Sequence, residues 1–160
     1  MCNKKEKYVH YRKSAEIIEL ANAFENGTLP PEKWTHEVYL TIAFWHLFFN
    51  PPIEAQALIR NDIRRYCFEN NIASTDNRAG HETLMFFWVQ MVSFYMKRFG
   101  AKLSFLELAN GVMRNFKDQN LPFRFYSREC LFSAQARTEW LEPDLILQSI
   151  RKTNSTAICN

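Results

Sequence analysis

The chain has 160 residues, of which 47% are hydrophobic and 15% aromatic, so its size and composition are those of one folded domain. It has only four glycines, and because tight hairpin turns depend on glycine, this composition argues against a β-sandwich. The formal net charge of +3 is too small to indicate a nucleic-acid-binding protein.

Two further classes of protein are not expected. The longest apolar runs, Val38–Phe49 and Leu84–Met96, are shorter than the roughly 20 residues that cross a membrane. Cysteines occur four times, without a C-x-x-C pair and without an apolar secretion signal at the start. Reduced thiols and a cytoplasmic location are therefore expected for these cysteines, which are Cys2, Cys67, Cys130 and Cys159.

The first half of the chain predicts three helices. Apolar residues at helical spacing predict the first helix over about 11–26, with Gly27 as its stop. Thr35 is a candidate N-cap for a second helix, which is apolar on most sides and ends at Asn50. A third, amphipathic helix begins at Pro52, since proline fits the first turn.

The second half opens on the most apolar stretch of the chain, residues 81–100. We expect this fourth helix to be covered on all sides by other helices, with Gly100 at the C′ position after it. Ser104 and Glu107 form a capping box that opens a fifth helix. Ser127 and Ser133 are candidate caps for two short helices after it.

These patterns predict an all-α fold, a compact bundle of about five main helices plus short C-terminal helices. A single domain over 11–150 is expected, with flexible tails at 1–10 and 151–160.

Polar residues gather at one end of the predicted bundle. Short connections make consecutive helices antiparallel, so the second and fourth helices would run parallel and bring His36 and His81 to the same end. The first helix would end there too, at Glu25. Residues expected to converge are His36, Glu37, Asp76, His81, Glu82, Tyr126, Arg128 and Glu129.

Some of these residues lie in recognisable segments: Trp34-Thr35-His36, Gly80-His81-Glu82-Thr83, Tyr126-Ser127-Arg128-Glu129-Cys130-Leu131 and Glu142-Pro143-Asp144. Together they resemble a family of small uncharacterised bacterial helical proteins over roughly residues 24–145. The resemblance implies a unit of fold and a site, and no known activity. Tyr39 stands where that family has a second histidine.

One interpretation of the cluster is a metal centre. His36, His81 and Glu82 offer the nitrogen and oxygen ligands that suit Zn, Fe or Mn, and a metal with an open position activates water. Tyr39 in place of a third histidine weakens this interpretation.

A second interpretation is a metal-free pocket for a small molecule or anion. Two helix N-termini would face it, Arg128 would bind a carboxylate or phosphate, and Glu82 and His81 would act as catalytic acid or base. The predicted ligand-binding residues are His36, Tyr39, Tyr126, Arg128 and Glu129.

The third interpretation is structural. His81 would be an N-cap, and Arg128 would form an ion-pair network with Glu82 and Glu129. The sequence thus predicts a small-molecule or metal-ion binding protein, with catalysis left open. The alternative is a non-catalytic helical protein that acts through protein–protein interaction. No membrane partner is expected, and the sequence does not define an oligomeric state or a reaction.

Overall fold

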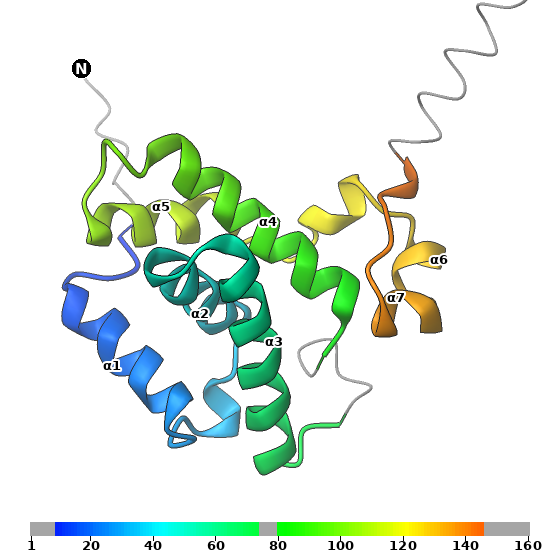
Figure 1. Ribbon diagram of the computed structural model, residues 1–160, viewed down its shortest axis with the longest axis horizontal. Coiled ribbons are helices and arrows are strands. Elements are labelled where there is room, and N and C mark those ends of the chain that lie inside the picture. The colour runs from blue at the N-terminus through cyan, green and yellow to red at the C-terminus, as the bar shows by residue number, and fades with distance from the viewer. Residues whose placement is uncertain (1–8, 74–79, 146–160) are drawn as a thin grey trace, which may run out of the picture.

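The computed structural model describes residues 9–73 and 80–145, and all the regular secondary structure in these ranges is helical (Figure 1). This confirms the all-α fold expected from the sequence. The helices are α1 (Ser14–Glu25), η1 (Pro31–Lys33), α2 (His36–Phe49), α3 (Pro52–Glu69), α4 (Glu82–Phe99), α5 (Phe105–Phe116), η2 (Leu121–Arg124), α6 (Arg128–Leu131) and α7 (Ala134–Thr138).

Local signals fix the helix ends where the sequence placed them. The Thr35 side chain accepts a hydrogen bond from the backbone N–H of Val38, and Ser104 forms a capping box with Glu107. Gly27 has φ +69° and ends α1, with the two backbone hydrogen bonds that complete a Schellman motif. Gly100 directly follows the last residue of α4, and its φ of −57° keeps it in the right-handed helical region.

Helix α4 connects the two parts of the molecule. On one side it packs against α2, α3 and α5, and on the other it meets α7. Figure 1 shows α4 crossing between the body formed by α1, α2, α3 and α5 and the region of α6 and α7. A helix with partners on two sides needs apolar residues on both, which explains its composition.

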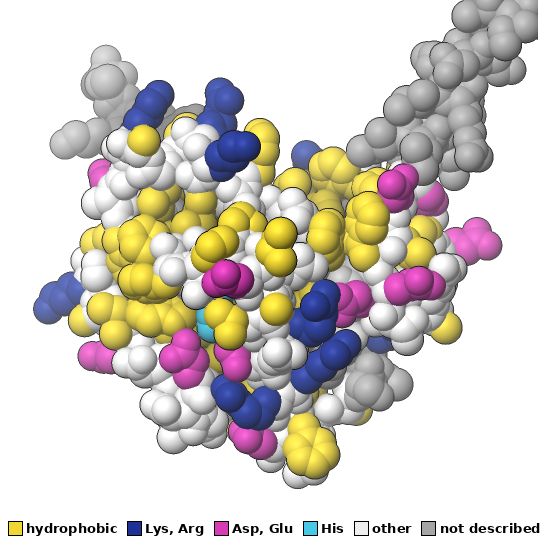
Figure 2. Space-filling view, in the orientation of Figure 1, with side chains coloured by type: hydrophobic (Ala, Val, Ile, Leu, Met, Phe, Trp, Pro, Cys, Tyr) yellow, Lys and Arg dark blue, Asp and Glu magenta, His cyan; other side chains and the backbone are white. Residues whose placement is uncertain are grey.

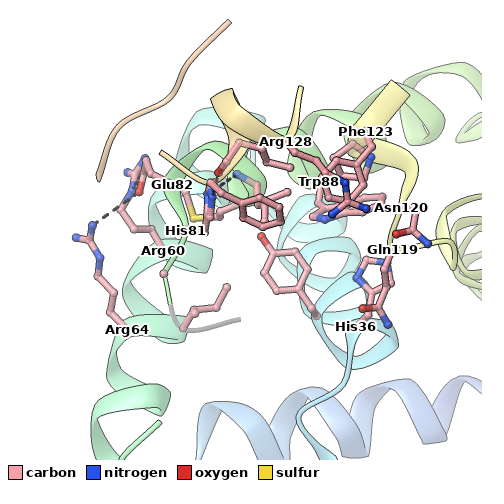
Figure 3. A pocket seen from close by; sticks show the side chains of 18 residues that line it. His36, Arg60, Arg64, His81, Glu82, Trp88, Gln119, Asn120, Phe123 and Arg128 are labelled. Carbon is pink, nitrogen blue, oxygen red and sulfur yellow. Dashed lines mark hydrogen bonds and ion pairs between the residues drawn. The ribbon is translucent and has the colours of Figure 1, made fainter. Parts of the chain in front are cut away.

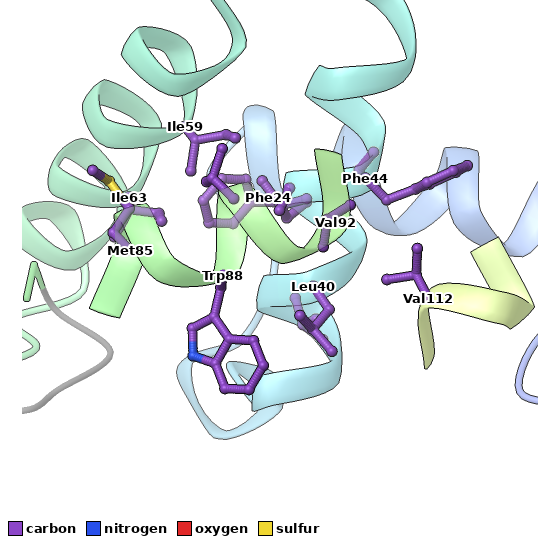
Figure 4. Close-up of a cluster of buried hydrophobic side chains, with 14 of the residues drawn as sticks. Phe24, Leu40, Phe44, Ile59, Ile63, Met85, Trp88, Val92 and Val112 are labelled. Carbon is purple, nitrogen blue, oxygen red and sulfur yellow. The ribbon is translucent and has the colours of Figure 1, made fainter. Parts of the chain in front are cut away.

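The core lies between α4 and the body. Buried side chains of five helices meet there, and they include Phe24, Leu40, Ile59, Val92 and Val112 (Figure 4). Closely spaced rings extend this core, since Phe24 lies 5.0 Å from Trp34 and 5.0 Å from Tyr66 between ring centroids.

The fourth helix is less covered than its sequence predicted. Phe94 in its second half is 66% exposed. The most enclosed helix is instead α2, where Leu40, Ile42 and Phe44 are fully buried.

The C-terminal segment, residues 121–145, is attached to α4 by side-chain hydrogen bonds and by rings. Thr83 Oγ1 donates to Glu139 O at 2.8 Å and accepts from Leu141 N at 3.1 Å. Phe87 lies 5.4 Å from Phe125 and Phe86 lies 4.9 Å from Trp140, between ring centroids. These contacts lie on the first two turns of α4, so that end of the helix is buried on both sides.

Most of the two predicted tails lies outside the described residues. This applies to residues 1–8 of the first tail and to all of the second tail, 151–160. At position 10 the backbone is fixed, because the N–H groups of His10 and Tyr11 both donate to Asn110 Oδ1. Within the described ranges no helix has both the length and the apolar character of a membrane span.

One face of the molecule carries a large apolar area. Figure 2 shows hydrophobic side chains gathered on the left, in the area between α1 and α5, with acidic and basic side chains interspersed toward α3. Exposed large hydrophobic residues near the junction of α2 and α3 are Phe48, Phe49, Ile53 and Leu58.

Candidate functional site

A cavity of about 320 Å³ opens where α2, α3 and α4 meet the C-terminal segment (Figure 3). Apolar and aromatic side chains provide the larger share of its surface, and polar and charged side chains form the rest. The side chains that shape it are His36, Tyr39, Arg60, Ile63, Arg64, His81, Glu82, Leu84, Met85, Trp88, Gln119, Asn120, Pro122, Phe123, Arg128, Leu131 and Phe132.

His81 is buried, with 1% of its surface exposed, and both ring nitrogens are bonded to backbone. Nδ1 accepts from Leu84 N at 3.2 Å, which caps α4, and Nε2 lies 2.7 Å from Leu131 O. Because a carbonyl can only accept, Nε2 carries the proton and the ring is neutral. Burial lowers the pKa of His81 below its ordinary value, although the bond to Leu131 acts in the opposite direction.

His36 also bonds to backbone. Its Nε2 donates to Phe116 O at 2.9 Å, and its ring lies 4.6 Å from the Trp88 ring between centroids. Burial is again the main cause that lowers the pKa of His36.

The two imidazoles do not share one site. His36 meets α4 at Trp88, seven residues beyond His81, which corresponds to about 10 Å along a helix. Figure 3 shows the two rings well separated along the cavity wall, with His81 near Glu82 and His36 near Gln119. The expected convergence therefore brings His36 and His81 to one cavity and not to one point.

Glu82 is held by two arginines of α3. Arg60 donates to Glu82 Oε1 through Nε at 2.8 Å and also through Nη2. Arg64 Nη2 lies 3.7 Å from the other carboxylate oxygen, Glu82 Oε2. The Arg64 side chain is 62% exposed, whereas that of Glu82 is 13% exposed. The carboxylate of Glu82 is thus paired within the fold.

The Tyr39 hydroxyl, unlike the Glu82 carboxylate, is left unpaired by the described residues. Its oxygen is buried in the cavity wall and has no hydrogen-bond partner among the described residues. Burial, reinforced by the negative charge of Glu82, raises the pKa of Tyr39 well above its ordinary value, so the phenol keeps its proton. It is a hydrogen-bond donor with nothing to bind among the described side chains.

Arg128 lines the cavity at the start of α6, and its guanidinium carbon lies 4.5 Å from the centroid of the Phe123 ring. This is the distance of a cation–π contact. Arg128 forms no ion pair with any carboxylate of the described residues, so the predicted network with Glu82 and Glu129 is not formed.

Several residues expected at this end of the bundle lie outside the cavity lining. Tyr126 is buried behind the cavity and donates to Leu141 O at 2.9 Å, with its pKa raised to about 12 mainly by burial. Glu129 is exposed on α6 and Glu37 is half-buried on α2, and both lie outside the cavity lining. Glu25 lies at a separate shallow hollow, where it accepts from Trp45 Nε1 at 2.9 Å. Asp76 is outside the described residues.

The metal interpretation gains no support from this geometry. The described residues contain no group of three or more His, Cys, Asp or Glu placed to hold a metal ion. His81 has no free nitrogen, and Glu82 is paired with Arg60, so a metal there would displace existing bonds. The same contacts leave His81 and Glu82 poorly placed as a catalytic acid and base.

The sequence did not single out the aromatic and cationic walls of the cavity. Only the fold shows that Trp88 and Phe123 line an opening. Arg60 and Arg64 lie four residues apart on one face of α3. This spacing is a signal in the sequence that an acidic side chain lies opposite them.

No protein-family model, no curated protein and no solved structure matches this chain. The resemblance carried by the short sequence segments therefore stays a prediction, and the function rests on the geometry of the cavity.

Proposed function

We propose that the protein binds a small organic molecule in the cavity between α4 and the C-terminal segment. The observation that carries the proposal is the Tyr39 hydroxyl, which is buried in the wall without a partner. A buried polar group left unbonded costs about 1–3 kcal/mol, so folded proteins rarely keep one that has no use. A ligand atom in the cavity would provide the missing partner.

The size and lining of the cavity support the same function. Its volume of about 320 Å³ is at the lower end of the roughly 300–1,000 Å³ found for small-molecule sites. Given about 30 Å³ for each water, it has room for about ten water molecules, or a ligand of similar size. Apolar walls with a few polar groups are typical of sites that bind a largely apolar molecule and orient it.

The fixed surroundings favour a site formed before the ligand arrives. His81, Glu82 and His36 are each bonded to another part of the chain, so these parts of the wall are held in place. A pocket that needs little ordering loses less free energy when it binds. Binding, without a reaction, is the function that these contacts support best.

The test is a screen of small aromatic and aliphatic compounds by thermal denaturation of the wild type, Tyr39→Phe and Tyr66→Phe. Tyr66 is the matched control, because its buried hydroxyl donates to Leu29 O at 2.9 Å and does not line the cavity. A compound that binds should raise the melting temperature of the wild type and of Tyr66→Phe, and raise that of Tyr39→Phe less.

Two results would contradict the proposal. One is a screen in which no compound stabilises the wild type. The other is a set of stabilising compounds that act equally on Tyr39→Phe, since the cavity wall would then have no part in binding. In either case the polar residues would be structural, as in the alternative of a non-catalytic interaction protein.

A further inference from the structure

The cavity carries an excess of positive charge. The described lining residues include three arginines and one glutamate, whereas both histidines are bonded as neutral rings at pH 7. Glu82 pairs with Arg60 and Arg64, so Arg128 is the one guanidinium of the described lining that no carboxylate neutralises.

The contact with Phe123 prepares Arg128 to bind an anion. The guanidinium carbon of Arg128 lies over the Phe123 ring. A guanidinium group that stacks on a ring with its flat face leaves the N–H bonds in its plane for other partners. These N–H groups match the two oxygens of a carboxylate, and a held side chain loses less rotational freedom on binding. Figure 3 shows Arg128 and Phe123 on the same side of the cavity, away from Arg60 and Arg64.

Arg128 and the Tyr39 hydroxyl, both in the cavity lining, differ in charge and exposure. Arg128 is exposed at the opening, whereas the Tyr39 hydroxyl is buried and close enough to Glu82 for that carboxylate to raise the pKa of the phenol. An anion beside Tyr39 would be repelled by Glu82, and an anion beside Arg128 would not. Met85, Trp88 and Leu131 line the same cavity and offer an apolar wall.

We infer that the ligand is an aromatic monocarboxylate, with its carboxylate on Arg128, its ring against the apolar wall and a polar group at the Tyr39 hydroxyl. This inference rests on the proposed function and adds the chemical class of the ligand. The single unneutralised arginine favours one negative charge. A phosphate monoester carries about −1.5 to −2 charges and three acceptor oxygens, which need more donors than Arg128 supplies.

The experiment compares four probes by isothermal titration calorimetry at concentrations up to about 10 mM, a range suited to ligands of this size. They are 3-(4-hydroxyphenyl)propionate, its neutral amide, 3-phenylpropionate and phenyl phosphate. The hydroxylated carboxylate should bind most tightly of the four. Loss of the negative charge in the amide should weaken binding by about 10- to 100-fold, the range for hydrogen bonds to charged groups.

Two substitutions assign the ends of the ligand. Arg128→Gln should weaken the carboxylate by a similar 10- to 100-fold and leave the amide within about twofold. Tyr39→Phe should remove the advantage of the hydroxylated carboxylate over 3-phenylpropionate. Arg124→Gln is the matched control, since Arg124 is an exposed arginine of the same segment outside the cavity lining, and it should bind all probes as the wild type does.

The outcomes separate this inference from the proposed function. Equal binding of amide and carboxylate, equal losses in Arg128→Gln and Arg124→Gln, or tighter binding of phenyl phosphate would each overturn the aromatic carboxylate. If neutral compounds still bound and their binding depended on Tyr39, the proposed function would stand without the aromatic carboxylate. If none of the probes bound, the inference would fail, and the wider screen would decide the proposed function.

Discussion

At the scale of single residues, similar side chains have different roles because their bonding partners differ. The hydroxyls of Tyr66 and Tyr126 each donate to a backbone carbonyl, whereas that of Tyr39 has no partner. His36 and His81 both bond to backbone carbonyls, and only His81 also caps a helix. Side-chain chemistry alone therefore does not separate a binding group from a structural one.

The two buried tyrosines should respond differently to loss of the hydroxyl. Tyr39→Phe removes an unbonded polar group and should leave the free energy of unfolding unchanged or slightly higher. Tyr66→Phe breaks the bond to Leu29 O and should lower it by about 0.5–1.5 kcal/mol. Urea denaturation of both variants measures the difference, and a larger loss in Tyr39→Phe would show that its hydroxyl is already bonded.

His81→Ala should destabilise the protein by about 1–3 kcal/mol. The substitution leaves Leu84 N without its cap and Leu131 O without its donor, both next to a buried ring position. His81→Asn should recover part of the loss, because asparagine can cap the helix but is too short to reach Leu131. Urea denaturation of the two variants tests this, and an unchanged unfolding free energy for His81→Ala would contradict the structural role.

At the scale of the helices, α4 and α5 approach closely where Gly111 faces Tyr95. A methyl group at Gly111 would lie 2.6 Å from Tyr95 Cζ and closer still to the hydroxyl oxygen. The ring of Tyr95 also packs against Phe99, with centroids 4.8 Å apart, so it has little room to move. Gly111 therefore sets the distance between these helices.

Gly111→Ala should lower the free energy of unfolding by about 1–3 kcal/mol through overpacking, although alanine favours helices more than glycine does. In a Tyr95→Ala background the same substitution should be neutral or stabilising, because the opposing ring is gone. Thermal and urea denaturation of the four proteins of this double-mutant cycle give the coupling. Equal effects in both backgrounds would show that the ring is not the cause.

The helices themselves were predictable from sequence, because their ends depend on neighbouring residues. Thr35, Ser104, Ser127 and Ser133 cap the helices they were expected to cap, since an N-cap needs only a side chain within three residues. The separation of His36 from His81 was not predictable, because it depends on how far α4 is displaced along α2. Helix spacing in the sequence does not determine such a displacement.

At the scale of the whole molecule, three buried or half-buried histidines respond to pH in the same direction. Burial is the main cause that lowers the pKa values of His36, His46 and His81 below the value of 6.5. For His46 the nearby Asp62, 3.1 Å away, opposes that effect. Below about pH 6.5 the unfolded chain therefore binds more protons than the folded protein.

The free energy of unfolding should accordingly fall as the pH decreases from about 6.5 toward the lower pKa values of the folded state. Urea denaturation at pH 7.5, 6.5 and 5.5 measures the change. His81→Gln, although less stable overall, should show a weaker pH dependence because one of the three groups is removed. A stability that rises on acidification through this range would contradict the assignment of neutral buried histidines.

The two-part wall of the cavity has a consequence for motion. His36 belongs to α2 and Trp88 to α4, whereas Phe123, Arg128 and Leu131 belong to the C-terminal segment. A molecule that touches both sides adds to the contacts that hold α6 and α7 against α4, and a ligand at 100 times its Kd contributes about 2.7 kcal/mol. Amide hydrogens of residues 128–138 should then exchange with deuterium more slowly in the bound protein, while those of α1, on the far side of the core, should change little. A bound ligand would thereby slow the opening of the C-terminal segment that encloses it.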